Sequence, residues 1–303
     1  MFTGCGTAMV TPFQADGSLD ENTLRRLVRR QIEEGIDFLV PCGTTGESPT
    51  LTLEEHLKVV SITVEEARHA PRHVPVLAGA GGYNTREVIE LARECQKAGA
   101  DGVLSVSPYY NKPNQEGLYQ HFKAIAESIR IPVIIYNIFG RTSVNVETET
   151  LMRLAEIPNI VGVKEASGQI GQIGDVAQSM PDDFSLLSGD DAITIPLIAL
   201  GGHGVISVVS NEVPGPMTEL VRRANAGDFA GARALHRKYL PLMKVNFVEP
   251  NPIPVKWAML RMGLMDSVSR LPMVPPSEPT KKKIDDVLES LSLREGAAVA
   301  NRH

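Results

Sequence analysis

The sequence predicts an α/β fold of the (β/α)₈ barrel class, a TIM barrel, with an additional C-terminal helical region. Two observations predict this class. Eight short apolar runs alternate with helix-length segments between residues 6 and 209, and a glycine-containing pattern recurs before several of these runs. Eight strands that alternate with helices match a closed parallel barrel better than an open doubly wound sheet.

Each predicted strand is a short, largely apolar run, and the run before Lys164 is also rich in β-branched residues. Such runs are typical of strands that are buried on both faces, as in a parallel sheet covered by helices. Helical spacing is clearest at residues 21–34 and 85–98, which precede the second and fourth strands. In chain order, the eight predicted strands span residues 6–11, 38–40, 74–78, 103–106, 133–136, 160–163, 184–187 and 205–209.

A partial internal repeat supports this order of elements. The sequence Glu34-Gly35-Ile36-Asp37 precedes the second strand, and Ala98-Gly99-Ala100-Asp101 precedes the fourth. In both, glycine can end a helix in a left-handed conformation, which turns the chain into the next strand. We expect residues 200–204, which contain three glycines, to do the same before the eighth strand.

The remainder of the chain is too long to be a single barrel helix. We predict a barrel core over residues 1–212, and the last barrel helix with a C-terminal helical region over residues 213–291. Residues 292–303 are predicted to be a flexible tail. Prolines divide the helical region into several segments, at Pro250, Pro252, Pro254, Pro272, Pro275 and Pro276.

Composition and charge exclude several classes of protein. With 43% hydrophobic and 22% charged residues, the 303-residue chain is of ordinary globular composition, and its net charge of −6 argues against nucleic acid as a partner. The sequence contains no apolar run of the roughly 18 residues that cross a membrane, and its N-terminus lacks a secretion signal. Cys5, Cys42 and Cys95 form no CxxC pair. We therefore expect a soluble, cytoplasmic protein with reduced thiols.

The sequence offers no convincing metal site. His69 and His73 are four residues apart, but Pro71 interrupts the helix that would place both on one face. The adjacent acids Asp190 and Asp191 are predicted to cap the helix that follows them. We expect no metal and no cofactor.

Lys164 is the first candidate for chemistry. It follows the sixth predicted strand and precedes a loop-like stretch, residues 165–168, and reactive groups of such barrels gather at this end of the strands. Burial lowers the proton affinity of a lysine, which yields a neutral amine that can attack a carbonyl group and form a Schiff base. The alternative is a side chain that extends from the barrel mouth into solvent. Other lysines, Lys256 among them, lie in polar or amphipathic segments and are interpreted as structural.

Two more strand ends carry polar groups. Residues 43–48 form a loop of small residues whose N–H groups and hydroxyls could bind a carboxylate, although the loop lacks the lysine and spacing of a P-loop. Tyr136 ends the strand next to that of Lys164 and could transfer protons to a forming imine. Arg141, a few residues on, could bind a substrate carboxylate. The alternatives are a plain turn, a core aromatic residue and a solvent-exposed arginine.

Several motifs, spread over nearly the whole chain, accompany these residues: Gly6-Thr7-Ala8, Gly43-Thr44-Thr45-Gly46-Glu47-Ser48, Pro108-Tyr109-Tyr110-Asn111-Lys112-Pro113, Gln115-Glu116-Gly117-Leu118-Tyr119, Val163-Lys164-Glu165-Ala166, Ser188-Gly189-Asp190-Asp191, Asn251-Pro252-Ile253-Pro254-Val255-Lys256 and Arg270-Leu271-Pro272. Together they resemble the dihydrodipicolinate synthase and N-acetylneuraminate lyase family of class I aldolases. The likeness is greatest to members that condense pyruvate with aspartate semialdehyde in the biosynthesis of lysine and diaminopimelate.

The resemblance implies four catalytic residues. Lys164 would form an imine with pyruvate, and the resulting enamine would attack the aldehyde of aspartate semialdehyde. Tyr136 would carry protons, linked through Thr44 to Tyr110 of a neighbouring subunit. Members of the family are usually homotetramers, and a relay that includes Tyr110 from another chain requires at least a dimer.

The resemblance also implies four substrate-binding residues. Thr45 would bind the pyruvate carboxylate and Arg141 the carboxylate of the aldehyde, while Gly189 and Ile206 would line the pocket with backbone groups. The chain departs from the family pattern near Arg141, with Phe139 where proline is typical and Ser143 where glycine is typical. These changes could reshape the aldehyde pocket.

The family's site for feedback inhibition by lysine is matched only in part. Leu53 and Tyr83 stand where inhibited members carry polar residues, so we do not expect inhibition. The matching positions are Ser48, His56, Glu87 and Tyr109.

Two other functions compete with this interpretation. One is a different pyruvate-imine aldolase or dehydratase of the same family, acting on a sugar acid or a hydroxy-oxo acid. The other is a barrel that binds a small carboxylate as a sensor, without covalent chemistry.

Overall fold

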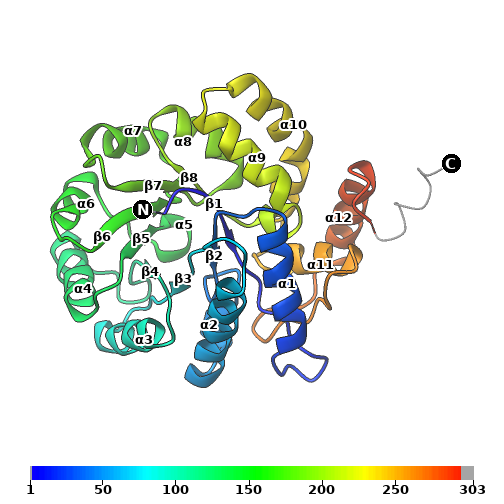
Figure 1. Cartoon of the computed structure of the whole chain (residues 1–303), viewed down its shortest axis with the longest axis horizontal. Helices are drawn as coiled ribbons and strands as arrows, with labels where there is room; N and C mark the ends of the chain where they lie inside the picture. Colours follow the sequence, from blue (N-terminus) through cyan, green and yellow to red (C-terminus); the bar gives the residue numbers. More distant parts are fainter. Residues whose placement is uncertain (1, 295–303) are drawn as a thin grey trace.

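Eight parallel strands form the centre of the computed structural model, which describes residues 2–294 (Figure 1). Their order around the sheet is β2-β1-β8-β7-β6-β5-β4-β3, and a parallel bridge between Leu39 and Val76 joins its two edges. The predicted (β/α)₈ barrel is therefore confirmed. The strands are β1 Gly4–Ala8, β2 Phe38–Val40, β3 Leu77–Gly79, β4 Gly102–Val106, β5 Val133–Asn137, β6 Ile160–Glu165, β7 Ser185–Ser188 and β8 Gly204–Ser207.

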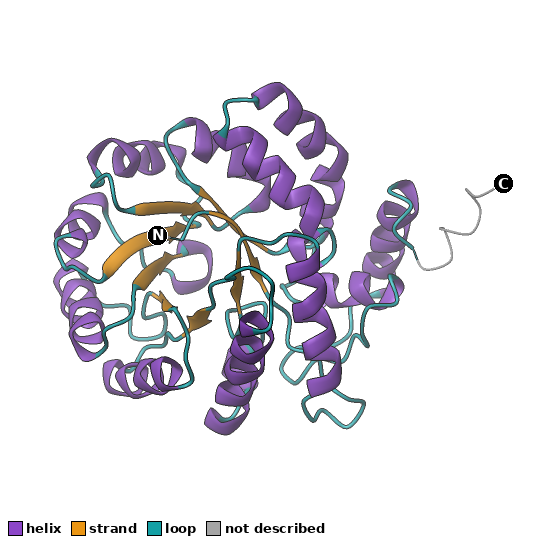
Figure 2. Ribbon diagram, in the orientation of Figure 1, coloured by secondary structure: helices purple, strands orange, loops and turns teal. Residues whose placement is uncertain are grey.

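Helices surround the barrel as an outer ring (Figure 2). None of the helices in the described part of the chain is both long enough and apolar enough to cross a membrane. The ring consists of α1 Glu21–Glu33, α2 Leu53–Arg68, α3 Thr85–Lys97, α4 Gln115–Ser128, α6 Thr148–Ala155, α7 Ile170–Ser179, α8 Thr194–Ala199 and α9 Pro214–Asn225. Four short helices lie in the connections: α5 Phe139–Thr142, η1 Ser48–Thr50, η2 Asp191–Ile193 and η3 Val209–Asn211.

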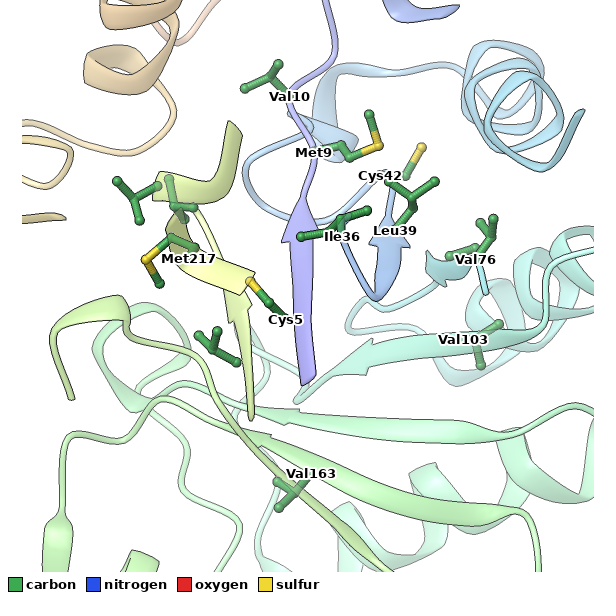
Figure 3. Close-up of a cluster of buried hydrophobic side chains, with 14 of the residues drawn as sticks. Cys5, Met9, Val10, Ile36, Leu39, Cys42, Val76, Val103, Val163 and Met217 are labelled. Atoms are coloured by element: carbon green, nitrogen blue, oxygen red, sulfur yellow. The ribbon is translucent and has the colours of Figure 1, made fainter. Parts of the chain in front are cut away.

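Side chains alternate between the two faces of each strand, and this alternation divides the core into two layers. The outer layer joins strands to helices, and Figure 3 shows part of it, with Leu39 and Val163 on strands and Met217 on α9. Tyr136 belongs to the inner layer, and Lys164 follows the outward-facing Val163, so it points into the barrel. The inner layer comprises Phe2, Ala8, Phe38, Val40, Leu77, Leu104, Ile134, Tyr136, Leu187 and Ile206.

Seven of the eight predicted strands differ from the observed ones in at least one limit, and only the second, residues 38–40, has the predicted limits. The differences are largest for the first, third and eighth strands. The first begins at Gly4 and ends at Ala8 rather than spanning residues 6–11, the third is Leu77–Gly79 rather than 74–78, and the eighth ends at Ser207 rather than at residue 209. The apolar residues beyond these strands are nevertheless buried. Hydrophobicity marks burial, whereas strand limits depend on ladder hydrogen bonds, so the apolar runs and the strands need not coincide.

The glycines of the repeated pattern have the predicted conformation. Gly35 and Gly99 follow α1 and α3 with φ angles of 89° and 92°, and Gly201 follows α8 with a φ of 109°. A residue with a β-carbon is strained in this region, because the side chain crowds the backbone. These three glycines therefore allow sharp turns from helix to strand.

The C-terminal region consists of α10 Phe229–Val245, α11 Ile253–Arg261 and α12 Glu278–Ser290. α10 packs on α9, and α12 contacts both α10 and α11; in Figure 1 this group lies on one side of the barrel. The predicted flexible tail lies, from residue 295 on, outside the described residues. The segment between α10 and α11 returns to the barrel and contributes to the site described next.

Candidate active site

Lys164 and Tyr136 are direct neighbours on adjacent strands. They are register partners between β6 and β5, and the Lys164 Nζ lies 4.2 Å from the centroid of the tyrosine ring. The lysine side chain is only 5% exposed, so the alternative of a side chain in solvent is wrong. β6 continues to Glu165, one residue beyond Lys164, so the lysine belongs to the strand rather than to the loop after it.

Burial changes the acidity of both groups. It lowers the pKa of Lys164 to about 7. The negative charge of Asp191 opposes this change, and the positive charge of Arg141 lowers the pKa by a smaller amount. Burial also raises the pKa of Tyr136 to about 12, which Arg141 and a hydrogen bond with Thr44 oppose. Near neutral pH the site therefore contains an amine that readily becomes neutral beside a phenol that keeps its proton.

The paired acids Asp190 and Asp191 have different roles. Asp190 caps η2 as predicted, since its carboxylate accepts a hydrogen bond from the Ala192 N–H at 2.8 Å. The prediction is wrong for Asp191, whose carboxylate accepts from the N–H groups of Val208 and Val209, both at 3.0 Å. Asp191 thus connects the segment after β7 to the segment after β8. Its buried carboxylate attracts the ammonium group of Lys164 and so opposes the lowering of the lysine's pKa.

Asn251 connects two of the predicted substrate-binding residues. Its side-chain amide donates to the Thr45 hydroxyl at 2.9 Å, and its backbone carbonyl accepts from the Arg141 guanidinium at 3.2 Å. Arg141 lies on α5 and is exposed, whereas Thr45 is buried in the loop after β2. Asn251 begins one of the motifs found in the sequence, residues 251–256, but its contact with Thr45 could not be predicted, because the two residues lie 206 positions apart in the chain.

Two cavities at this end of the barrel share Thr44, Tyr136 and Arg141 among their lining residues. The larger has a volume of about 270 Å³ and extends along Ser48, His56 and Tyr109. The smaller, of about 50 Å³, contains the site itself. Its lining includes Thr44, Thr45, Tyr136, Arg141, Lys164, Gly189, Phe247 and Asn251.

Gly189 lies so close to Lys164 that the position has no space for a larger residue. A β-carbon at Gly189 would lie 2.6 Å from the Ala166 β-carbon and 3.1 Å from the Lys164 Cε. The Gly189 N–H donates to the Glu165 carbonyl at 2.8 Å. Glycine at this position therefore lets the backbone after β7 approach the amine.

The other two predicted residues, Ile206 and Tyr110, are not among the described residues that line the two cavities. Ile206 packs in the inner layer of the barrel with Tyr136. Tyr110 is 84% exposed, with its ring centroid 6.3 Å from that of Tyr83. In this single chain, Tyr110 is thus a surface residue rather than part of the site.

Known proteins resemble this chain over nearly its whole length. The family model of the Dihydrodipicolinate synthetase family matches residues 1–291. The chain is 52% identical over 298 residues to the 4-hydroxy-tetrahydrodipicolinate synthase of Koribacter versatilis (strain Ellin345), with 98% of each chain covered. It is 51% identical over 293 residues to the enzyme of that name from Syntrophus aciditrophicus (strain SB), covering 97% of this chain and 99% of the relative.

Solved structures show the same similarity. The crystal structure of dihydrodipicolinate synthase from Aquifex aeolicus matches with a TM-score of 0.94 and 44% identity, over 97% of this chain and 99% of the other. The enzyme from Thermotoga maritima matches with a TM-score of 0.93 and 47% identity, over 97% and 99% of the two chains.

Proposed function

Since this chain belongs to the dihydrodipicolinate synthetase family, we infer that it is a 4-hydroxy-tetrahydrodipicolinate synthase. It condenses pyruvate with L-aspartate 4-semialdehyde, a step of lysine and diaminopimelate biosynthesis, and is a lyase that forms a Schiff base. The observation that carries this conclusion is the buried amine of Lys164, whose pKa is lowered to about 7 beside Tyr136. The names of the relatives support this activity rather than action on a sugar acid.

We propose that Lys164 is the nucleophile. Its neutral amine attacks the carbonyl carbon of pyruvate, and loss of water gives the imine. The imine withdraws electrons and acidifies the methyl group, whose deprotonation gives an enamine that attacks the aldehyde carbon. The amine of the second substrate then attacks the imine carbon, closes the ring and releases the lysine. The imine itself is the electron sink, so this sequence of steps uses no metal and no cofactor.

We propose that Tyr136 moves the protons and that Thr44 links its hydroxyl to the rest of the relay. The phenol of Tyr136 is beside the amine, and its raised pKa keeps it protonated and able to donate. A phenol in this position can protonate the departing water and later accept a proton from the second substrate.

The carboxylates of pyruvate and of the aldehyde require separate hydrogen-bond donors. Because the Thr45 hydroxyl oxygen accepts a hydrogen bond from Asn251, its hydrogen is free to donate to the pyruvate carboxylate. Arg141 lines both cavities and presents a guanidinium for the carboxylate of the aldehyde. The backbone of Gly189 completes the wall beside Lys164, and we keep the backbone of Ile206 as a proposed contact.

The pKa of Lys164 leads to a pH dependence. The amine attacks only when neutral, and its neutral fraction increases as the pH rises towards a pKa of about 7. At subsaturating pyruvate, we expect the rate of imine formation to rise about tenfold per pH unit below this pKa and to level off above it. Borohydride trapping, timed between pH 5 and pH 9, measures this rate. A rate that continues to rise to pH 9 would mean that the amine has an ordinary pKa.

We propose that Tyr110 completes the relay in a neighbouring subunit, within a homotetramer or at least a dimer. Its 84% exposure in one subunit leaves the ring available to a partner. We expect Tyr110→Phe to lower kcat by about tenfold or more. Mixed assemblies of Tyr110→Phe with Lys164→Met chains should regain activity, since an intact Lys164 then receives an intact Tyr110. Mixed assemblies that form but stay inactive would contradict a shared site.

We also propose that the enzyme acts in the cytoplasm. Its three cysteines, Cys5, Cys42 and Cys95, are free and buried, as is usual in a reducing compartment. Cell fractionation followed by the activity assay tests this location.

One experiment separates the candidate functions. Borohydride with pyruvate should add the mass of one three-carbon acid to the peptide that carries Lys164, and aspartate semialdehyde should then give turnover in an assay coupled to the next reductase of lysine biosynthesis. Trapping without turnover on aspartate semialdehyde would point to another aldehyde or sugar acid. An unmodified lysine, together with thermal stabilisation by pyruvate, would point to a carboxylate sensor.

A further inference from the structure

A fully buried ion pair lies behind the loop that carries Thr44 and Thr45. Lys256 of α11 has no exposed surface, and its ammonium pairs with the Glu47 carboxylate. The same Nζ donates to the Val268 carbonyl at 2.7 Å and lies 4.4 Å from the centroid of the Phe13 ring. The predicted amphipathic segment does not account for this burial.

The pair lies in the protein interior, where the burial of charged groups is unfavourable. Burial lowers the pKa of Lys256 to about 8, and the attraction of Glu47 opposes this change. The free energy needed to remove two charges from water often exceeds the free energy that their attraction supplies. Well-packed apolar residues at such a position therefore often give a more stable protein than a buried ion pair. Stability alone is therefore a weak explanation for this pair.

Glu47 also has a strained backbone. Its φ and ψ angles are 53° and 35°, in the left-handed region that residues with a β-carbon rarely adopt. Such strain persists when surrounding contacts fix the residue. Here both ends of the carboxylate are held, because one oxygen pairs with Lys256 and the other accepts from the Arg270 N–H at 3.1 Å.

The backbone of Glu47 leads directly into the site. Its N–H donates to the Thr44 carbonyl at 3.1 Å, and the Gly46 N–H donates to the Gly43 carbonyl at 3.1 Å. The Thr11 hydroxyl donates a hydrogen bond to the Gly46 carbonyl at 2.7 Å. A rotation of Glu47 out of the left-handed region would therefore displace Thr44 and the residue after it.

We propose that Glu47 and Lys256 are positioning residues, which hold residues 43–48 in the conformation that binds the carboxylate of pyruvate. This inference rests on the proposed function. Neither residue lines the smaller cavity around Lys164, so both act through Thr44 and Thr45. The C-terminal helical region thereby contributes to the chemistry of the barrel, through α11.

The test measures the pyruvate concentration that half-saturates borohydride trapping of Lys164, without the aldehyde. Lys256→Met and Glu47→Gln should each raise this concentration at least tenfold. The double variant Glu47→Gln/Lys256→Met leaves no buried charge unpaired, so its unfolding temperature should recover towards that of the wild type. Its half-saturating pyruvate concentration should stay raised, because no ion pair remains to fix the backbone at residue 47.

A buried carboxylate that lines neither of the two cavities supplies a matched control. Glu66 on α2 pairs with Arg25 and Arg29 of α1 at 2.8 Å and 2.6 Å. Glu66→Gln should lower the unfolding temperature and leave the half-saturating pyruvate concentration within twofold of the wild-type value. This variant separates lost stability from lost positioning.

The outcomes are distinct. If the single variants do not fold, the double variant decides. If the double variant folds and its half-saturating pyruvate concentration lies within twofold of the wild-type value, the positioning role is overturned. If the wild-type enzyme itself forms no trapped adduct, the proposed function has failed instead.

Discussion

Replacing Lys164 with methionine is expected to lower kcat by at least about a thousandfold, because the nucleophile of the reaction is lost. Methionine is unbranched and similar in length, so it can occupy the same inward-facing position beside Tyr136. The coupled assay with pyruvate and aspartate semialdehyde measures the loss. Mass spectrometry after borohydride treatment should find no pyruvate adduct on the variant chain.

The stability of the Lys164→Met variant supplies the control. The pKa of Lys164 is about 7 in the folded protein and near 10.5 in the unfolded chain. The unfolded chain therefore binds more protons between these values, and the buried amine lowers stability at neutral pH. Removing it should leave the unfolding temperature at pH 7 equal or higher. Activity within tenfold of the wild type in this folded variant would exclude Lys164 as the nucleophile.

Tyr136→Phe is expected to lower kcat by about a hundredfold to ten-thousandfold, the range of a lost general acid–base group. The aromatic ring stays packed in the inner layer of the barrel, while the hydroxyl that contacts Thr44 is removed. Lys164 is retained, so prolonged trapping with borohydride should still give the pyruvate adduct. The coupled assay and the time course of trapping separate slow proton transfer from lost binding.

The matched control for Tyr136→Phe is Tyr119→Phe. Tyr119 lies on α4, where its ring stacks with Arg153 at 4.1 Å from the ring centroid. This variant should keep kcat within about twofold, as for a surface change away from the site. If Tyr136→Phe were as active as Tyr119→Phe, another group would have to carry the protons.

The sequence was sufficient to predict the fold and the pair at its centre. The apolar runs at 133–136 and 160–163 are short and β-branched, and both proved to be buried parallel strands. Parallel strands of a barrel present their carboxyl ends on the same face. For this reason, Tyr136 and Lys164 could be predicted as neighbours from their places at the ends of consecutive strands.

Other properties depended on contacts between distant parts of the chain. Asp190 behaved as a local cap, whereas Asp191 turned to the backbone after β8. Lys256 has the sequence context of an ordinary helix lysine, yet it is completely buried against Glu47. A one-dimensional pattern specifies periodicity and local capping, but it does not specify which remote group satisfies a buried charge.

The sequence by itself determined the number of strands, their alternation with helices, the left-handed glycine turns, and the lysine most suited to Schiff-base chemistry. Each depends on local spacing, side-chain branching or backbone freedom, which neighbouring residues encode. Only the tertiary structure decided the pKa of that lysine, the link from Asn251 to Thr45 and the partner of Glu47. The pKa arises from burial, and the two contacts join groups that lie more than 200 residues apart in the chain. No local segment determines the packing that brings them together.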